Sequence, residues 1–304
     1  MKRFEIVPNF SEGRRKEIID ELCRCYSEMP GVILLDHESD EDHNRSVLTA
    51  VGEEQALSDA TMAACRIAMR EIDLNHHQGG HPRMGAMDVL PFLPLEDATT
   101  EDAVAAAHRL GQRLWDELKV PVYFYEEASV GPVKKLLPQI RKGNFEGLRE
   151  AVKTQPERRP DVGGPDLHET FGASVIGARL PLVAFNVYLN TLDLDVAKQI
   201  AKTVRESSGG MRNVRAIAID TRAQGNVQVS MNLVDVEKTP IHRAYEFVER
   251  EAHQLGVTVA SSEIVGLVPL SAMLACAVRS LHLKGFQEEQ VLEVRLMRED
   301  RQQR

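Results

Sequence analysis

The sequence predicts an α/β protein of the α+β type, with two ferredoxin-like βαββαβ units that follow one another along the chain. Its 304 residues suffice for about two domains of ordinary size. Each half repeats the order strand, helix, strand, strand, helix, which is the order of the split βαβ unit. Between the halves lies a stretch, 154–172, with three prolines, three glycines and little periodicity. We therefore expect an N-terminal domain over residues 1–178 and a C-terminal domain over residues 179–304.

The elements of the first half follow from hydrophobic periodicity. Alternating or continuous apolar runs predict strands at 3–8, 31–36, 45–51, 86–93 and 120–125. Apolar residues at helical spacing predict helices over 12–29, 53–71 and 101–118. The last of these helices places Val104, Leu110 and Leu114 on one face, as expected for a helix that packs on a sheet.

The pattern restarts in the second half. Strands are predicted at 180–189, 213–220, 226–234 and 257–260, and helices at 194–205, at 240–255 and from Pro269 onward. We expect each sheet to carry its helices on the outer face, so that the two open sheet faces flank a central cleft. Ligands are often bound at such domain interfaces.

Composition excludes several classes of function. A net charge of −9 without a basic tract argues against nucleic-acid binding. The N-terminus has no signal-peptide core, and the longest apolar run, 264–278, is too short to span a bilayer. The four cysteines match neither a zinc pattern nor a disulfide scaffold, and the three that lie on apolar or helical patterns are expected to be small buried side chains. We expect a cytoplasmic protein.

The most informative segment is His76–Val89, HHQGGHPRMGAMDV, which combines three histidines, an arginine, an aspartate and three glycines. Gly79 and Gly80 permit close approach of another group, and Pro82 restricts the backbone of His81. Histidine is the side chain best suited to moving protons near neutral pH. His81 is thus a candidate general acid–base, with a purely structural histidine as the alternative, while His76 and His77 are expected to be peripheral.

Other polar residues near this segment have two open interpretations. Arg83 is either an ordinary ion-pair partner or a clamp for a ligand carboxylate. Asp88, Asp36 and Glu12 either cap backbone groups or orient the imidazole. Asn9 and Ser11, where the first strand meets the first helix, are either capping residues or ligand hydrogen-bond partners.

Several cofactor sites are disfavoured. The chain has no HExxH or CxxC spacing, so we expect no metal. It has no P-loop and no GxGxxG, which disfavours nucleotide cofactors, and no GxSxG nucleophile elbow.

A set of motifs spread over residues 3 to 297 strongly resembles the glutamate formiminotransferase family. The motifs are VPNFSEG (7–13), GVILLD (31–36), NRSV (44–47), GGHPRMGAMDVLPF (79–92), VPVYFY (120–125), GASVIGAR (172–179), AFN (184–186) and IVGLVPL (264–270). The resemblance implies transfer of a formimino group from N-formimino-L-glutamate to N5 of tetrahydrofolate, in histidine degradation and one-carbon metabolism. It also implies a homodimer without a metal cofactor. Because the chain ends where this module would end, we expect no cyclodeaminase half.

The resemblance assigns roles to individual residues. The family's catalytic histidine falls on His81, and its folate-binding loop falls roughly on 163–172, where this sequence is least similar to the family. The implied loop contacts are Gly163, Gly164, Pro165, Asp166, Leu167, His168, Glu169, Thr170, Phe171 and Gly172. Further implied substrate contacts are Asn9, Ser11, Asp36, Arg45, Arg83 and Met84. Phe171 is expected either to stack on an aromatic ring of the ligand or to be a buried anchor, and the loop is expected to contribute little to the core.

The residues fit this chemistry. Attack of N5 on an amidine-like carbon requires one proton to leave N5 and another to reach the departing nitrogen, and one histidine can serve both steps. Both substrates carry glutamate carboxylates, which arginines suit. Two alternatives remain, a metal-dependent amidohydrolase of formiminoglutamate and a folate-binding module without turnover. The donor is also open, since formylglutamate differs at one position.

Overall fold

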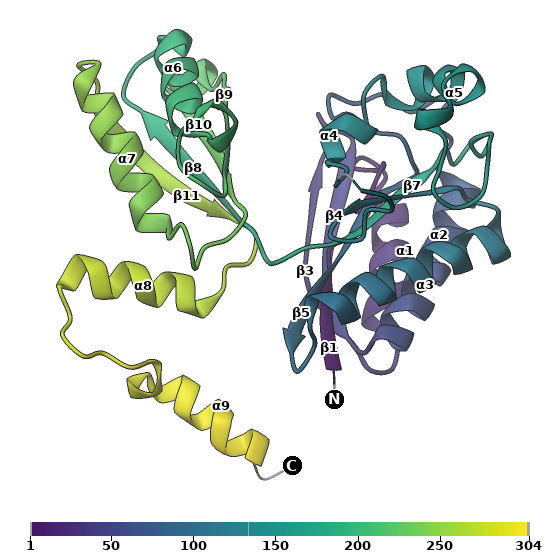
Figure 1. Cartoon of the computed structure of the whole chain (residues 1–304), viewed down its shortest axis with the longest axis horizontal. Coiled ribbons are helices and arrows are strands. Elements are labelled where there is room, and N and C mark those ends of the chain that lie inside the picture. The colour runs from purple at the N-terminus through teal and green to yellow at the C-terminus, as the bar shows by residue number, and fades with distance from the viewer. Residues whose placement is uncertain (1, 133, 303–304) are drawn as a thin grey trace. The chain divides into compact units, whose positions relative to one another are not determined.

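The chain folds into two compact units, one over Met1–Leu180 and the other over Pro181–Arg304. The computed structural model describes residues 2–132 and 134–302 (Figure 1). Each unit combines one mixed or antiparallel sheet with helices, so the predicted α/β class is confirmed. Each unit is described separately below.

The first unit is a βαββαβ core with an extension. Along the chain its core contains β1 Lys2–Ile6, β2 Asn9–Phe10, α1 Lys16–Ser27, β3 Val32–Asp40, β4 Arg45–Gly52, α2 Glu54–Glu71 and β5 Met87–Glu96. The strands β1 and β2 lie between β4 and β5, and β3 is the outer neighbour of β4. The central strands are antiparallel, which is the ferredoxin-like arrangement that the strand and helix order predicts.

The extension adds two parallel strands to the edge of β5. It contains α3 Thr100–Leu118, β6 Val122–Glu126, α4 Leu137–Ile140, α5 Asn144–Thr154 and β7 Ser174–Ala178. Strand β7 pairs in parallel with both β5 and β6, and the sheet therefore has seven strands. The sequence analysis missed β7, because its small residues form no long apolar run, and it also missed the short helices α4 and α5.

Local chemistry sets the ends of the helices. Helix α1 begins only at Lys16, because the Glu12 carboxylate accepts the backbone N–H groups of Arg14 and Arg15, both at 2.9 Å, just before it. This is the capping role that the sequence left open for Glu12. Helix α3 begins at a capping box, in which Thr99 and Asp102 each accept a hydrogen bond from the other's backbone N–H.

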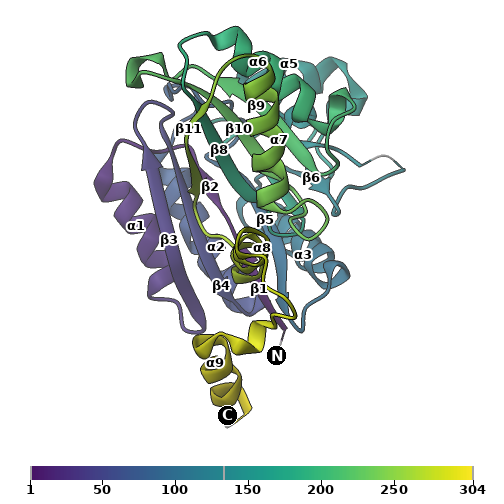
Figure 2. The same ribbon diagram turned by 90° about the vertical axis from the view of Figure 1, so that its left-hand side faces the viewer.

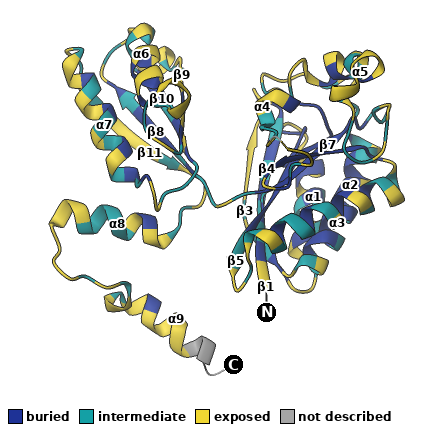
Figure 3. Ribbon diagram, viewed as in Figure 1, coloured by how far each residue is buried: buried dark blue, intermediate teal, exposed yellow. Residues whose placement is uncertain are grey.

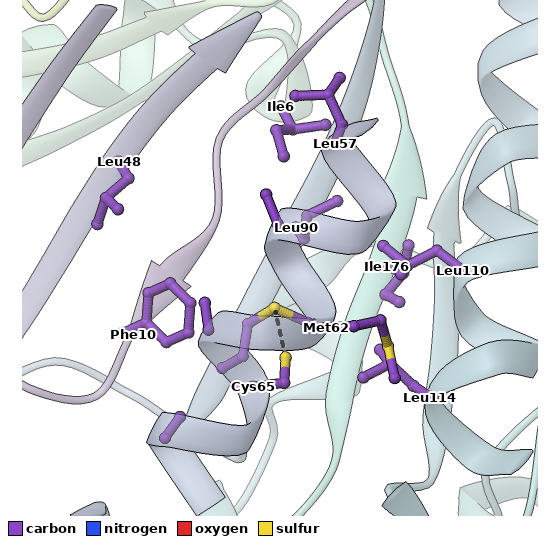
Figure 4. Packing of buried hydrophobic residues seen from close by; sticks show 14 of the residues in the cluster. Ile6, Phe10, Leu48, Leu57, Met62, Cys65, Leu90, Leu110, Leu114 and Ile176 are labelled. Carbon is purple, nitrogen blue, oxygen red and sulfur yellow. Dashed lines mark hydrogen bonds between the residues drawn. The ribbon is translucent and has the colours of Figure 1, made fainter. Parts of the chain in front are cut away.

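The main core of the first unit lies between the sheet and helices α1–α3. Figure 4 shows Phe10 and Leu48 from the sheet, Met62 and Cys65 from α2, and Leu110 from α3 in this cluster. Cys65 is fully buried with its Sγ 3.5 Å from Sδ of Met87, so it is a small core side chain as predicted. A second cluster on the opposite face of β5, β7 and β6 is covered by α4 and α5.

The second unit is a four-stranded βαββαβ fold. Its elements are β8 Val183–Leu189, α6 Leu194–Val204, β9 Val214–Ile219, β10 Val227–Leu233, α7 Ile241–Gln254 and β11 Val259–Val265. The strand order is β11-β8-β10-β9 with every pair antiparallel, which confirms the predicted ferredoxin-like unit. Helices α6 and α7 cover one face of this sheet (Figure 2). After β11 come α8 Leu270–Leu281 and α9 Leu292–Gln302, and most of the described α9 side chains are exposed (Figure 3).

None of the helices in the described ranges is both long and apolar enough to cross a membrane.

Candidate active site in the first unit

Three hydrogen bonds hold the segment before His81 against the turn that joins β3 to β4. The Gly80 N–H donates to the Asp42 carbonyl at 3.0 Å. The Asn44 side-chain amide donates to the Gln78 carbonyl at 3.0 Å, and the His77 ring nitrogen Nε2 lies 2.9 Å from the Asn44 carbonyl. Two segments that are distant in the sequence therefore form one loop cluster around Asn44.

This close approach requires glycine at position 79. A Cβ atom on Gly79 would lie 2.2 Å from the His43 carbonyl oxygen, well inside van der Waals contact. The glycine pair was predicted to allow the approach of something large, and the group that approaches is the chain's own β3–β4 turn.

The His81 imidazole is half-buried against Arg45, the first residue of β4. The distance from Arg45 Nη1 to His81 Nε2 is 2.6 Å. A guanidinium only donates, so Nε2 accepts and the ring proton is on Nδ1. Burial first, and then the charges of Arg45 and Arg141, lower the pKa of His81 from its usual 6.5 to about 3. The imidazole is therefore neutral at physiological pH in the ligand-free chain.

Arg141, which the sequence analysis did not single out, belongs to the same cluster. Its guanidinium forms an ion pair with Asp88, whose other carboxylate oxygen accepts the Met84 N–H at 2.7 Å. The Nε of Arg141 is buried and has no hydrogen-bond partner among the described residues. Burial first, and then the charge of Arg141, lower the pKa of Arg45, and the carboxylates of Asp88, Asp40 and Glu38 oppose this shift.

One buried donor of this cluster lacks a partner. Asp88 pairs with Arg141, and the carboxylates of Asp40 and Glu38, besides that of Asp88, act on Arg45, but the Nε of Arg141 is not satisfied among the described residues. A buried N–H donor without a partner is costly unless a ligand or water accepts its hydrogen bond. The arrangement thus favours a ligand with a hydrogen-bond acceptor, such as a carboxylate, at Arg141. Asp88 pairs with Arg141 rather than with the imidazole, so it does not orient His81 by a direct hydrogen bond.

Arg83 is engaged within the protein. Its guanidinium forms two hydrogen bonds with the Glu146 carboxylate, at 2.7 and 3.0 Å, and further bonds with the ring and the carbonyl of His77. Arg83 is only 9% exposed. It connects the His81 segment to α5, which corresponds to the ion-pair interpretation in a buried setting. His77, bonded to both Arg83 and Asn44, is part of the framework that holds this segment, and its peripheral role in the chemistry stays a prediction.

The remaining predicted contacts in the first unit are dispersed. The Ser11 hydroxyl donates to the Gly85 carbonyl at 2.8 Å and so ties the chain after β2 to the HPRMG motif. The Asn9 side chain donates to the Val7 carbonyl, and the Asp36 carboxylate on β3 accepts the His37 N–H. Met84 is fully buried in the core.

The second half of the predicted folate loop is held beside the same motif. The Ala86 N–H donates to the Phe171 carbonyl at 2.8 Å, and the Leu74 N–H donates to the Thr170 carbonyl at 2.9 Å. His168 and Gly172 exchange two backbone hydrogen bonds of 2.9 Å. The loop therefore closes on itself and lies against both ends of the 74–86 segment.

Phe171 is fully buried in the main core of the first unit. Of the two roles expected for it, the structure shows the buried anchor, and its ring has no exposed face for a ligand to stack on. This burial also contradicts the expectation that the loop contributes little to the core. The exposed residues of the loop, which a ligand can reach, are Gly163, Pro165, Asp166 and Glu169.

No group of three or more histidine, cysteine or acidic side chains with metal-binding geometry occurs within residues 2–132 and 134–299.

Comparison with known proteins identifies the family. Residues 3–179 match the family model of the formiminotransferase domain, N-terminal subdomain, and residues 184–298 match that of the formiminotransferase domain. The chain belongs to the formiminotransferase family. The two matched regions correspond to the two compact units.

Relatives of known name cover nearly the whole chain. It is 41% identical to the glutamate formimidoyltransferase of Streptococcus pyogenes, over 97% of this chain and 99% of that protein. It is 44% identical to the glutamate formimidoyltransferase of Thermoplasma acidophilum, over 96% and 97% respectively. It is also 42% identical to the mouse formimidoyltransferase-cyclodeaminase, over 90% of this chain but 51% of that protein.

A first prediction concerns the electrostatic effect of Arg45. The substitution Arg45→Met removes a positive charge next to Nε2, so the pKa of His81 should rise from about 3 toward 6.5. NMR titration of the imidazole carbons measures this, and the exposed Arg24→Met on α1 is the control. An unchanged His81 titration in Arg45→Met would show that the guanidinium does not hold the pKa down.

The same shift predicts how stability depends on pH. The native pKa lies below the unfolded value, so the unfolded chain binds the proton more readily. The contribution of His81 to stability is therefore complete above pH 6.5 and is lost as the pH falls toward about 3. We expect His81→Gln to lose less stability than the wild type between pH 7 and pH 5 in urea unfolding. Parallel losses in the two proteins would contradict the shift.

A third prediction concerns the loop. Phe171→Ala removes a fully buried aromatic ring and should destabilise the protein by roughly 3–5 kcal/mol in denaturant unfolding. The exposed Asp166→Ala in the same loop should stay within about 0.5 kcal/mol of the wild type. Equal stability of Phe171→Ala and the wild type would mean that the ring is not part of the core in solution.

Proposed function

We propose that the chain is a glutamate formimidoyltransferase, which moves the formimino group of N-formimino-L-glutamate to N5 of tetrahydrofolate. The observation that carries the proposal is the cluster of His81, Arg45 and Arg141, a proton-transfer group flanked by two guanidiniums of which one has a buried unpartnered N–H. Such a cluster suits a substrate that carries carboxylates. Near-full-length similarity to proteins named for this activity supports it.

In the proposed reaction, His81 acts as general base and then as general acid. N5 of tetrahydrofolate forms a bond to the formimino carbon, and His81 accepts the proton that N5 loses. The tetrahedral intermediate then collapses as the bond from carbon to the glutamate nitrogen breaks, and His81 delivers the proton to that nitrogen. Tetrahydrofolate is a co-substrate, and no metal enters the proposal. Proton transfer of this kind typically contributes on the order of 10²–10⁴-fold.

The low pKa of His81 in the ligand-free chain gives substrate binding a second role. A base with a pKa of about 3 is too weak to take a proton from N5 efficiently. Burial lowers this pKa most, and the charges of Arg45 and Arg141 lower it further. A substrate carboxylate bound by the two guanidiniums offsets that second contribution, and it draws Arg45 away from Nε2. We propose that binding of the anionic donor thereby raises the pKa of His81 to a useful value.

The proposal extends to the remaining predicted contacts. Of these contacts, we place Arg45 on the substrate, together with Arg141. We also propose that the loop 163–172 contributes to folate binding through its exposed residues. Similarity to the family also supports a homodimer that acts in the cytoplasm, and light scattering of the purified chain tests the dimer.

A steady-state assay of His81→Ala tests the central role. We expect kcat to fall by roughly 10²-fold or more while tetrahydrofolate still binds and the fold is retained. His76→Ala is the matched control, because His76 is exposed and, among the described residues, bonds only to Asp73. Near-wild-type kcat in His81→Ala would remove this residue from the mechanism.

The same assay separates the alternatives. Release of the formimino group should require tetrahydrofolate and should be unaffected by a chelator. Turnover without tetrahydrofolate that stops on chelation would establish a metal-dependent amidohydrolase, and folate binding without turnover would establish a binding module. Running formyl- and formiminoglutamate in parallel identifies the donor.

A further inference from the structure

A second histidine lies beside His81. The imidazole rings of His43 and His81 meet edge to face, with 6.2 Å between their centroids and an angle of 73° between their planes. His43 belongs to the turn between β3 and β4, and its carbonyl is the group that lies against Gly79. The close approach that places Arg45 on His81 therefore also brings a second imidazole to the same site. The proposed mechanism gives this ring no role.

Asp40, the last residue of β3, orients the His43 ring. One oxygen of its carboxylate accepts the His43 backbone N–H at 2.8 Å, and the other lies 2.8 Å from the ring nitrogen Nδ1. An ionised carboxylate only accepts hydrogen bonds, so Nδ1 carries the proton of the neutral ring. The other nitrogen, Nε2, has no partner among the described residues and is the atom that can give or take a proton.

The two imidazoles have different surroundings. His81 is half-buried, and its Nε2 accepts a hydrogen bond from the Arg45 guanidinium. The His43 side chain is 54% exposed, and it forms an ion pair with the Asp40 carboxylate whenever the ring is protonated. One ring is thus next to a positive charge and largely shielded, whereas the other is next to a negative charge and can exchange a proton with water. Neighbouring titratable groups in such contrasting surroundings are typical of acid–base catalysis.

The two rings also interact electrostatically. Burial first, then the charges of Arg45 and Arg141, and to a smaller extent that of His43, lower the pKa of His81. The titratable and charged groups that face His43 are Asp40 on its own turn, His81 on the segment packed against it, and Arg45 beyond that ring. His43 is therefore close enough to take part in proton transfers at His81.

The proton balance of the proposed reaction leaves a task for a second group. His81 carries the proton of N5 to the glutamate nitrogen, which already bears one hydrogen and is therefore released as a neutral –NH₂ group. An α-amino group is mostly protonated at pH 7, so the released amino acid takes up one more proton. Until it does, its lone pair can attack the formimino carbon again and reverse the transfer.

We propose that His43, oriented by Asp40, is a second proton-transfer residue of this site. The inference rests on the proposed function. Protonated His43 gives the proton on Nε2 to the released glutamate amine, so the N–H bond on the ring breaks and a third N–H bond forms on the amine. The amine becomes an ammonium group without a lone pair, and His43 regains a proton from water on its exposed side.

Steady-state kinetics of His43→Ala in the full-length protein test this inference. We expect kcat to fall roughly tenfold or more at pH 7, and KM for both substrates to stay within about twofold of the wild type, because the guanidiniums that bind substrate remain. A proton donor must be protonated, so the wild-type kcat should decline as the pH rises, and this decline should be absent in His43→Ala. Added imidazole supplies the missing acid from solution and should restore part of the lost kcat.

His76→Ala is the matched control. Asp73 and His76 have the same spacing in the sequence as Asp40 and His43, and the distance from His76 Nδ1 to the Asp73 carboxylate is 3.0 Å. None of the described contacts of His76 involves His81. This variant should keep the wild-type kcat and its dependence on pH.

Asp40→Asn tests the orienting carboxylate. The ring remains in this variant, but its protonated form loses a negative neighbour, so the decline of kcat should move to lower pH. A decline at the wild-type pH would contradict the role of Asp40.

Wild-type kcat and an unchanged dependence on pH in His43→Ala would overturn the inference. A fall in kcat that imidazole does not restore would overturn it equally, since the ring would then act only by holding the turn in place. The proposed function fails separately. A wild-type chain that transfers no formimino group contradicts the transferase, whereas an active chain that does not need His43 contradicts this inference alone.

Discussion

The contact between the guanidinium of Arg45 and Nε2 of His81 is the interaction on which the chemistry of the first unit depends. It depends on Gly79, which lies against the turn between β3 and β4, where Asn44 bonds to both Gln78 and His77. The turn places Arg45 at the start of β4, and the segment places His81 against it. One local close approach therefore fixes the position and the protonation state of the candidate base.

In the proposed mechanism, this contact makes the carboxylates of the substrates matter for the rate as well as for binding. Burial first, and then the charges of Arg45 and Arg141, keep the imidazole neutral, and Arg45 donates to the lone pair on Nε2. A carboxylate in the same place reverses both effects, because it attracts the guanidiniums and favours the protonated ring. In the proposed mechanism, the donor thus activates its own base.

The sequence predicted the fold more completely than the site. Long helices such as α2 and α3 were identified because their apolar residues recur at helical spacing over many turns. Strand β7 was missed because Ser174 and Gly177 interrupt it, and only pairing with β5 and β6 makes it a strand.

At the site, His81 and Arg45 were named from a motif and a resemblance. Arg141 lies in a segment without a motif, and only the tertiary fold brings it to Asp88. The apolar stripe of Phe145, Leu148 and Val152 on α5 was the one available signal that a folded segment covers this region. Arg83 and Phe171 were predicted to contact ligands because an arginine and an aromatic ring often do so. In the structure, Arg83 forms an ion pair with Glu146 and Phe171 is buried in the core.

The most direct test of this account is the pKa of His81 measured with and without the donor substrate. NMR titration of the imidazole carbons in the full-length protein, first free and then saturated with N-formimino-L-glutamate in the absence of tetrahydrofolate, gives both values. The account predicts a pKa of about 3 in the free protein and a clear rise toward 6.5 in the complex. The same low pKa in both states would contradict activation of His81 by the substrate carboxylate.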